Sequence, residues 1–351
     1  MSAPARPVFH IRAETASHGF FAQVVYVLNQ LLYCEREGFE PFVYIPPRFK
    51  DGVNPYHDEA RGENSWEYFF EPVGDLDWRD QIGGPNTLRQ LSDEELVQLH
   101  VNNPQSIFLY PYHHYRQKVR YDRDWYEAQR TKARGVIDRY IKIKPEILKA
   151  VERFVLNEFA PGPVLGIHAR GTDKRRVGNH SLLARIVPPK KYRRLIDRYL
   201  GDHPTARLFV ATDQQQFLDE FDAYYPGLVI STDSLRSTRV GDDSNVFQQS
   251  GNGYQKGLDV LRDALLLSRC DHLIKCCSAV GEFALYFNRD LTETDVSHYY
   301  AREPWITLLT PLDWIVERLE RRNEEALRAY YRVMGQMGRW KNYLLRPQSG
   351  A

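Results

Sequence analysis

The sequence predicts an α/β protein whose second half folds as a parallel, doubly wound sheet. Beyond residue 162, short apolar runs alternate regularly with helical segments, which is typical of βα units in a parallel sheet. The run Ala160-Pro-Gly-Pro163 interrupts the helical pattern before it and marks a boundary. With 351 residues, the chain also exceeds what one hydrophobic core usually supports, so two domains are expected.

The first half is predicted to open with a strand, a helix and a second strand. Residues 7–13 form a short apolar run, and after a glycine-containing turn an apolar helix reaches about Arg36. Residues 40–45 form the next strand, which two prolines close. Helical periodicity then covers residues 126–159, where a proline starts the second of two helices.

Two aromatic-rich stretches of the first half have more than one interpretation. Residues 48–78 are polar and aromatic, so they could bind an acceptor sugar or form a structural insertion with a small core of its own, and we prefer the insertion. Residues 108–126 combine Tyr, His and Arg, which suits a carbohydrate site or a domain interface equally. Both alternatives remain open from the sequence.

In the second half, the predicted strands and helices follow one another with short connections. The strands are residues 164–169, 208–211, 228–231 and 272–276, and the helices are residues 189–200, 214–224, 255–268 and 278–287. An extended piece at residues 305–309 precedes a long charged amphipathic helix at residues 311–337. We expect that helix to fold back across the domain interface.

Composition sets limits on partners and location. Lys and Arg number 47 and Asp and Glu 46, so a net charge of +1 gives no electrostatic reason to expect nucleic acid or an anionic membrane as partner. The N-terminus lacks the apolar core of a signal peptide, and the apolar stretch 20–34 is too short to span a bilayer. A soluble, cytoplasmic protein is expected.

The four cysteines form no C-x-x-C pair and are predicted to be buried free thiols: Cys34, Cys270, Cys276 and Cys277.

Basic side chains follow the predicted strand 164–169. His168, Arg170 and Lys174 crowd together at its carboxyl end, where open α/β sheets bind their ligands. Arg can grip two phosphate oxygens at once and Lys adds a point charge, so this end of the strand favours an anionic ligand. The competing interpretation is a solvated strand end in which Asp173 pairs with Arg170 or Lys174.

Two predicted turns lead directly into helices. Ser278 is a natural N-cap, and the free N–H groups of Ala279, Val280 and Gly281 could bind a phosphate. A plain helix cap explains the same residues. The turn at Gly19 could likewise place a helix N-terminus at a ligand, or it could simply connect the strand to the helix. Thr212 or Asp213 is predicted simply to cap the helix that follows.

Asp263 borders the apolar stripe of its predicted helix, so its carboxylate needs hydrogen-bond donors. The edge of a guanine base would supply them, and an arginine of the chain would equally do so. Among the 11 histidines no set of metal ligands stands out. Bound phosphate would then be neutralised by cationic side chains and helix N-termini.

These motifs together resemble a known family. His168-Ala-Arg-Gly-Thr-Asp-Lys174 resembles the first motif of the α-1,6-fucosyltransferases, His-x-Arg-Arg-Thr-Asp-Lys, and Phe209-Val-Ala-Thr-Asp213 is similar to their second motif. Asp263-Ala-Leu-Leu-Leu-Ser268, with Asp271 and Ser278, resembles the third in order and spacing, and Gly19-Phe-Phe-Ala-Gln23 resembles their N-terminal glycine loop. The match covers mainly residues 164–286.

The resemblance implies a GT-B architecture, in which two Rossmann-like domains face each other across a cleft, with GDP-fucose as donor and no metal or other cofactor. The domains would be residues 1–161 on the acceptor side, residues 162–305 for the nucleotide sugar, and a C-terminal segment at residues 306–351. Arg170 and Lys174 would act at the reacting phosphate and sugar, whereas His168 and Asp263 would contact the guanine or ribose. The nucleotide-sugar site would comprise Gly19, Gln23, His168, Arg170, Thr172, Asp173, Asp263, Ser278 and Ala279.

Two positions depart from the family. Its second Arg is Gly171 here, and its catalytic Glu, four positions beyond the Lys, is Gly178. A base from the first half is therefore expected, among His57, Asp58, Glu59 and Glu63. The sequence accordingly predicts an inverting glycosyltransferase that transfers fucose to a glycan acceptor in polysaccharide biosynthesis. A GT-B transferase for another nucleotide sugar, or a catalytically inactive nucleotide- or glycan-binding homologue, are the alternatives.

Overall fold

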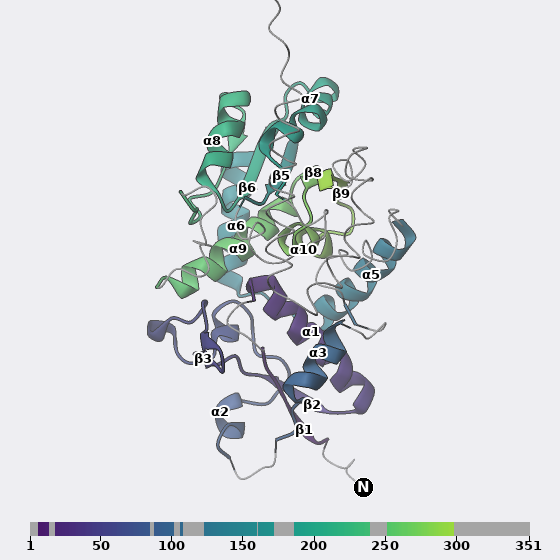
Figure 1. The fold of residues 1–351 in the computed structure, drawn as a ribbon, viewed down its shortest axis with the longest axis vertical. Helices are drawn as coiled ribbons and strands as arrows, with labels where there is room; N and C mark the ends of the chain where they lie inside the picture. Colours follow the sequence, from purple (N-terminus) through teal and green to yellow (C-terminus); the bar gives the residue numbers. More distant parts are fainter. Residues whose placement is uncertain are drawn as a thin grey trace, which may run out of the picture.

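The computed structural model describes residues 6–13, 18–84, 88–101, 106–107, 123–159, 161–171, 186–238 and 251–297 (Figure 1). The predicted extended piece at residues 305–309, the helix at residues 311–337 and most of the second aromatic stretch lie outside these ranges. The domain boundaries given above therefore remain predictions.

The first half begins with a parallel β–α–β unit. Strand β1 (Val8–Ile11) pairs with β2 (Glu40–Val43), and helix α1 (Phe20–Glu37) connects them. The helix ends at Gly38, whose φ of 74° is left-handed and whose N–H donates to the carbonyl of Cys34. Glycine adopts that conformation without the steric penalty of a Cβ, which explains where α1 stops.

The rest of the first half consists of short elements and helices. They are β3 (Arg48–Phe49), β4 (Gly52–Val53), the 3-10 turns η1 (Glu59–Arg61) and η2 (Ser65–Tyr68), α2 (Trp78–Gln81), α3 (Asp93–Val101), α5 (Arg123–Tyr140), α6 (Pro145–Phe154) and the π-helical turn η3 (Val155–Phe159). The aromatic residues of the 48–78 region are mostly buried in the hydrophobic core: Tyr56, Trp66, Tyr68, Phe69 and Phe70. The same cluster contains residues of α1 and, from the second half, Leu261 and Leu265, so the region is part of the main core and the predicted small core of its own is wrong.

The second half contains a five-stranded, wholly parallel sheet in the order β7-β6-β5-β8-β9. Its elements are β5 (Val164–Ala169), η5 (Pro189–Lys191), α7 (Arg193–Asp202), β6 (Arg207–Thr212), α8 (Gln215–Tyr224), β7 (Val229–Ile230), α9 (Gly253–Leu267), β8 (His272–Lys275), α10 (Ala279–Phe287) and β9 (Thr292–Asp295). The predicted α/β fold with a parallel sheet is confirmed. Strand β9 was not predicted, because its sequence Thr-Glu-Thr-Asp carries no apolar signal.

Both faces of this sheet are covered, which is why its strands are apolar on both sides. Leu165 and Ile167 pack with α7 and α8 in one hydrophobic cluster, whereas Val164 and Phe209 pack with α9 and α10 in another. The alternation follows the two-residue period of a strand. All four cysteines are buried free thiols, as predicted.

The cluster on the α9 and α10 side continues into the first half of the chain. The ring of Phe21 on α1 stacks on that of Phe283 on α10, with centroids 4.0 Å apart. Gly257 of α9 leaves room for Phe69, since a Cβ there would lie 2.4 Å from the Phe69 ring. Figure 1 shows α1 beside α10 at the junction of the two halves.

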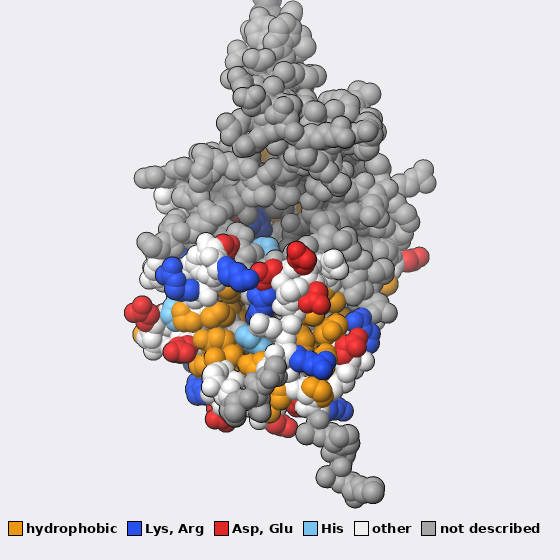
Figure 2. Space-filling model, turned by 60° about the horizontal axis from the view of Figure 1, so that its bottom comes forward, with side chains coloured by type: hydrophobic (Ala, Val, Ile, Leu, Met, Phe, Trp, Pro, Cys, Tyr) orange, Lys and Arg blue, Asp and Glu red, His pale blue; other side chains and the backbone are white. Residues whose placement is uncertain are grey.

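The surface of the first half carries both signs of charge. In Figure 2, the Lys and Arg side chains are interspersed with Asp and Glu around apolar areas. A mixed surface of this kind creates no extended field of one sign on that face. In the described ranges, no helix is both long and apolar enough to cross a membrane.

Candidate functional site

The polar residues singled out in the sequence after β5, β6 and β8 follow the carboxyl ends of these strands, at one edge of the sheet. His168, near the end of β5, is in register with Ala211 of β6 on one side and with Lys275 of β8 on the other. The residues that follow these strands, among them Arg170 and Ser278, therefore emerge at the same edge. This is the edge at which open parallel sheets bind ligands.

The turn after β5 is held by the residue that follows β6. Gly171 donates its N–H to Oδ1 of Asp213 at 2.7 Å, and Arg170 Nε lies 4.0 Å from Oδ2 of the same carboxylate. The predicted capping of α8 by Thr212 or Asp213 is wrong, because the N-cap is Gln214 and it makes no side-chain cap bond. Thr212 Oγ1 accepts instead from the N–H of Gln214 at 3.3 Å, one residue before the helix. Arg170 keeps 24% of its side chain exposed.

Gly171 departs from the family motif for a steric reason that the structure supplies. A Cβ at this position would lie 2.0 Å from Oε1 and 2.7 Å from Cβ of Gln214, a buried residue. Gln214 thus fills the space that a side chain at residue 171 would need. Arginine could occur here only if Gln214 moved or were smaller.

His168 is buried among the strands, with 5% of its surface exposed. Its carbonyl accepts hydrogen bonds from the N–H of Cys276 at 3.3 Å and from the hydroxyl of Tyr192 at 3.2 Å. Its Nδ1 lies 3.8 Å from the Cys276 sulfur. The imidazole therefore belongs to the packed strand ends from which the Ser278 turn emerges.

The turn at Ser278 has the form of an anion site. Ser278 is the N-cap residue of α10, fully buried, with an extended backbone (φ −157°, ψ 147°). Contrary to the plain cap interpretation, its side chain makes no cap bond, and in the described part of the chain its buried Oγ has no hydrogen-bond partner. An unsatisfied buried hydroxyl beside the free N–H groups of a helix start suits a ligand oxygen.

Asp263 is buried on α9 and its carboxylate has protein donors. Oδ1 accepts hydrogen bonds from Thr232 Oγ1 at 3.0 Å and Ser234 Oγ at 3.2 Å, both just beyond β7. Asp259, one turn earlier, accepts from the N–H of Leu235 at 2.8 Å, so the two acids together bind this loop to α9. Burial raises the pKa of Asp263 to about 6, although the Thr232 hydroxyl opposes the change.

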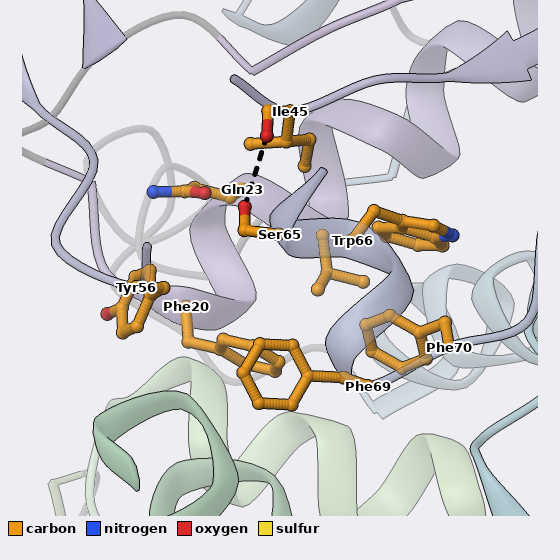
Figure 3. A pocket seen from close by; sticks show the side chains of 9 residues that line it. Phe20, Gln23, Ile45, Tyr56, Ser65, Trp66, Phe69 and Phe70 are labelled. Atoms are coloured by element: carbon orange, nitrogen blue, oxygen red, sulfur yellow. Dashed lines mark hydrogen bonds between the residues drawn. The ribbon is translucent and has the colours of Figure 1, made fainter. Parts of the chain in front are cut away.

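The start of α1 faces a small aromatic cavity. Gly19 is the N-cap of α1, and Gln23 donates to the carbonyl of His18 at 3.4 Å. Gln23 also lines a cavity of about 20 Å³ with Phe20, Tyr56 and other aromatic residues (Figure 3). A cavity of this size holds about one water molecule, so it is not an acceptor pocket.

The remaining predicted residues lie in the first half of the chain or outside the described residues. His57 Nδ1 is 3.1 Å from the Tyr68 hydroxyl, Asp58 accepts from the N–H of Ala60, and Glu59 and Glu63 are exposed. Thr172, Asp173 and Lys174 lie outside the described residues. Across the described ranges, no three His, Cys, Asp or Glu side chains come close enough to form a set of metal ligands.

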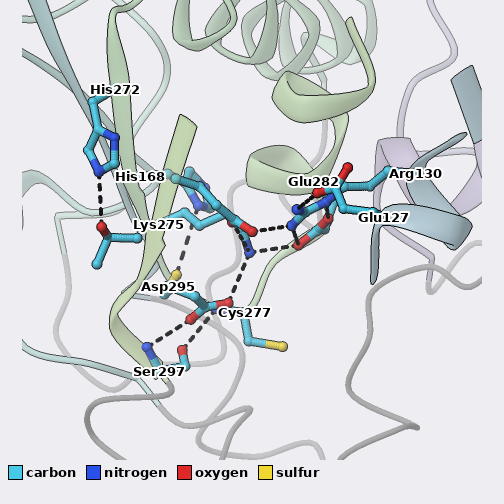
Figure 4. A network of polar contacts seen from close by, with 12 residues as sticks. Glu127, Arg130, His168, His272, Lys275, Cys277, Glu282, Asp295 and Ser297 are labelled. Carbon is cyan, nitrogen blue, oxygen red and sulfur yellow. Dashed lines mark hydrogen bonds and ion pairs between the residues drawn. The ribbon is translucent and has the colours of Figure 1, made fainter. Parts of the chain in front are cut away.

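Sequence reasoning missed a group of buried charges beneath the Ser278 turn. Lys275 ends the apolar strand β8, and Glu282 is the one charged residue of α10 (Figure 4). Both side chains are almost fully buried. A charge inside an apolar element needs a charged partner, and that rule could have identified the pair.

Comparison with known proteins supports the resemblance stated above. No family model matches the chain. The chain is 26% identical over 167 residues to nodulation protein Z of Bradyrhizobium diazoefficiens, a match that covers 46% of this chain and 44% of that protein. The chain thus matches less than half the length of this relative, and its predicted similarity to the nodulation-type family is confirmed.

The chain is also similar to solved structures, at lower sequence identity. The crystal structure of NodZ α-1,6-fucosyltransferase soaked with GDP-fucose overlaps with a TM-score of 0.44 at 19% identity, covering 81% of this chain and 93% of that one. POFUT1 in complex with GDP-fucose overlaps with a TM-score of 0.45 at 11% identity, covering 84% and 99%.

Proposed function

We propose that the protein is an inverting glycosyltransferase that transfers fucose from GDP-fucose to a glycan acceptor without a metal. The observation that carries the proposal is the turn at Ser278, where a buried hydroxyl without a partner in the described residues meets the free N–H groups of α10. The family motifs and the match to nodulation protein Z support the same donor. Four free cysteines fit a reducing compartment, so we place the activity in the cytoplasm.

The GT-B arrangement belongs to this proposal. The parallel sheet of the second half would form the nucleotide-sugar domain, and the β–α–β unit of the first half would face it across a cleft. Gly19 and Gln23, at the start of α1, would line the cleft opposite the strand ends. The contact between α1 and α10 supports this placement.

The proposed reaction uses the residues at the sheet edge. The acceptor hydroxyl attacks the anomeric carbon of fucose on the face opposite the phosphate, and the carbon–oxygen bond to GDP breaks. Negative charge then grows on the leaving phosphate. Arg170, Lys174 and the N–H groups at Ser278 and Ala279 would stabilise that charge, which lowers the barrier more than uniform binding does. His168, Thr172, Asp173 and Asp263 would hold the nucleoside.

A base must accept the proton of the acceptor hydroxyl. Gly178 cannot do so, and we assign the role to one of His57, Asp58, Glu59 and Glu63. Among them, His57 is partly exposed and shares a hydrogen bond with the Tyr68 hydroxyl, which would fix the orientation of its ring. Alanine variants of all four, assayed for GDP release with acceptor present, test this choice. Unchanged turnover in every variant would refute it.

Calorimetric titration with GDP, GDP-fucose, GDP-mannose, UDP and CMP tests the donor. We expect selective binding of the guanosine ligands. Arg170→Ala should weaken GDP binding by about 100-fold, because a charge-assisted bond to phosphate is lost. Arg36→Ala, which removes an exposed ion pair with Glu37, is the matched control and should leave GDP affinity unchanged.

Other outcomes lead to the alternatives. A preference for UDP or CMP would indicate a GT-B transferase that uses another nucleotide sugar. Binding of GDP-fucose without release of GDP, in an acceptor screen, would indicate a catalytically inactive binding protein. Undiminished GDP affinity in the Arg170→Ala variant would refute the assignment of the phosphate site.

A further inference from the structure

A buried ionic network lies directly beneath the proposed phosphate site. Lys275, 1% exposed, places its Nζ 2.6 Å from Glu282 Oε1 on α10. The same Nζ lies 2.9 Å from Asp295 Oδ2 and 3.3 Å from Glu293 Oε2, both on β9 (Figure 4). One cation at the end of β8 therefore joins the neighbouring strand to the helix that starts at Ser278.

A second cation reaches the same carboxylate from the first half of the chain. Arg130 of α5, 4% exposed, places its Nε 3.2 Å from Glu282 Oε2 and also pairs with Glu293. Lys275 contacts Oε1 of Glu282, and Arg130 contacts both oxygens, from Nε to Oε2 at 3.2 Å and from Nη2 to Oε1 at 3.5 Å. The carboxylate is fixed in both position and orientation.

Stability alone does not account for such a network. Removing charges from water is costly for each ion, and well-packed apolar side chains often stabilise a fold as effectively. Burial by itself would raise the pKa of Glu282, but Lys275 and Arg130 lower it to about 2. Burial raises the pKa of Glu293. The carboxylate of Glu282 is therefore the acid that stays ionised between its two cations.

The network bears directly on the first turn of α10. A Cβ at Gly281 would lie 2.9 Å from Cδ and 3.1 Å from Cβ of Lys275, so the stem of the lysine passes immediately under this turn. Its Nζ is anchored by three acids and cannot swing away. The backbone that offers its N–H groups at the helix start consequently rests on the Lys275 stem.

The far end of α10 is fixed by the same helix of the first half. Arg134, one turn beyond Arg130 on α5, donates from Nε and Nη2 to the carbonyl of Leu285 at 3.0 and 2.9 Å. Cys277, just before the turn, donates its N–H to Ser297 Oγ at 2.9 Å. These contacts hold α10 at both ends and prevent it from sliding along its axis.

We propose that Glu282 is a positioning residue, which Lys275 and Arg130 hold so that the first turn of α10 faces the phosphates of the donor. This inference rests on the proposed function and extends it to residues that touch no ligand. Electrostatic stabilisation needs donors placed within a few tenths of an ångström before the charge develops. The contacts of Glu282 with Lys275 and Arg130 provide that placement.

Titration of the whole protein with GDP and with guanosine tests the proposal. Lys275→Met should weaken GDP binding on the order of tenfold, because small displacements of binding groups cost this much. Guanosine affinity should stay unchanged, because the nucleoside makes no use of the turn. Arg139→Met is the control, since Arg139 lies on α5 but pairs with Glu35 of α1, and we expect both affinities to stay as in the wild type.

Gly281→Ala provides a second variant that keeps every charge. Its new Cβ would press on the Lys275 stem and displace the turn. It should show the same selective loss of GDP affinity, even if Lys275→Met does not fold. Undiminished GDP affinity in this variant, or an equal loss of GDP and guanosine, would overturn the positioning role. A wild-type protein that binds no GDP would instead refute the proposed function itself.

Discussion

Asp263→Asn should stabilise the protein at neutral pH and weaken its nucleotide binding. The folded structure raises the pKa of Asp263 from 3.8 to about 6, chiefly by burial. A difference of about 2 in pKa corresponds to about 3 kcal/mol at roughly 1.36 kcal/mol per unit. Asn keeps an oxygen that can accept from the Thr232 and Ser234 hydroxyls, so the variant avoids the cost of a buried charge without losing these bonds.

The sign of the pH dependence follows from proton linkage. Between pH 4 and 6 the folded state holds the Asp263 proton and the unfolded state does not, so wild-type stability falls as pH rises through this window. The cost is complete above about pH 6 and absent below about pH 4. The Asn variant lacks this term, so its advantage should grow from about pH 4 and level off above about pH 6.

Thermal unfolding measured from pH 4.5 to 8 tests the reasoning. For a chain of 351 residues, 3 kcal/mol corresponds to about 4 °C in Tm at pH 7.5. Asp219→Asn, on the exposed side of α8, is the control and should change Tm little at any pH. We propose that Asp263 binds the base, so GDP affinity should fall about 10- to 100-fold in this variant, because the charged hydrogen bond proposed there would be lost. A gain in Tm that is the same at every pH would refute the origin assigned to it.

Three further predictions concern packing and thiol access. Gly257→Ala should destabilise by about 1–3 kcal/mol in denaturant titration, because a Cβ would lie 2.4 Å from Phe69, whereas Gly201→Ala has open space and should stabilise by about 1 kcal/mol. Gly171→Ala should lower Tm, and Gln214→Ala in the same chain should recover it. Simple additivity of the two changes would contradict this contact. The four buried cysteines should react slowly with a thiol reagent until the protein unfolds, so rapid labelling of the native protein would refute their burial.

Many strands and helices of the second half could be predicted from the sequence, because short apolar runs between turn residues mark them locally. Strand β5 has the predicted bounds, since a short apolar run between Pro-Gly-Pro and a basic cluster has few other interpretations. The polar strand β9 could not be found, because only its pairing with β8 makes it a strand. The Ser278 turn was located correctly, but the absence of its side-chain cap bond depends on tertiary placement.

The partners of the site residues were harder to predict than the residues themselves. Asp263 was singled out as a buried carboxylate that needs donors, yet Thr232 and Ser234 lie in another βα unit and carry no signal for that role. Arg130 and Glu282 lie far apart in sequence and in different halves, so no local pattern connects them. Long-range pairing of polar groups is set by the fold and not by spacing along the chain.

The stacking of Phe21 on Phe283 limits how this chain can be recombined. Residues 160–163 look like a natural place to exchange the second half for that of a related protein. A chimera joined there would leave the Phe21 face without the aromatic ring it stacks on. It would also separate Arg130 from Glu282. The packing of each half therefore depends on residues of the other half.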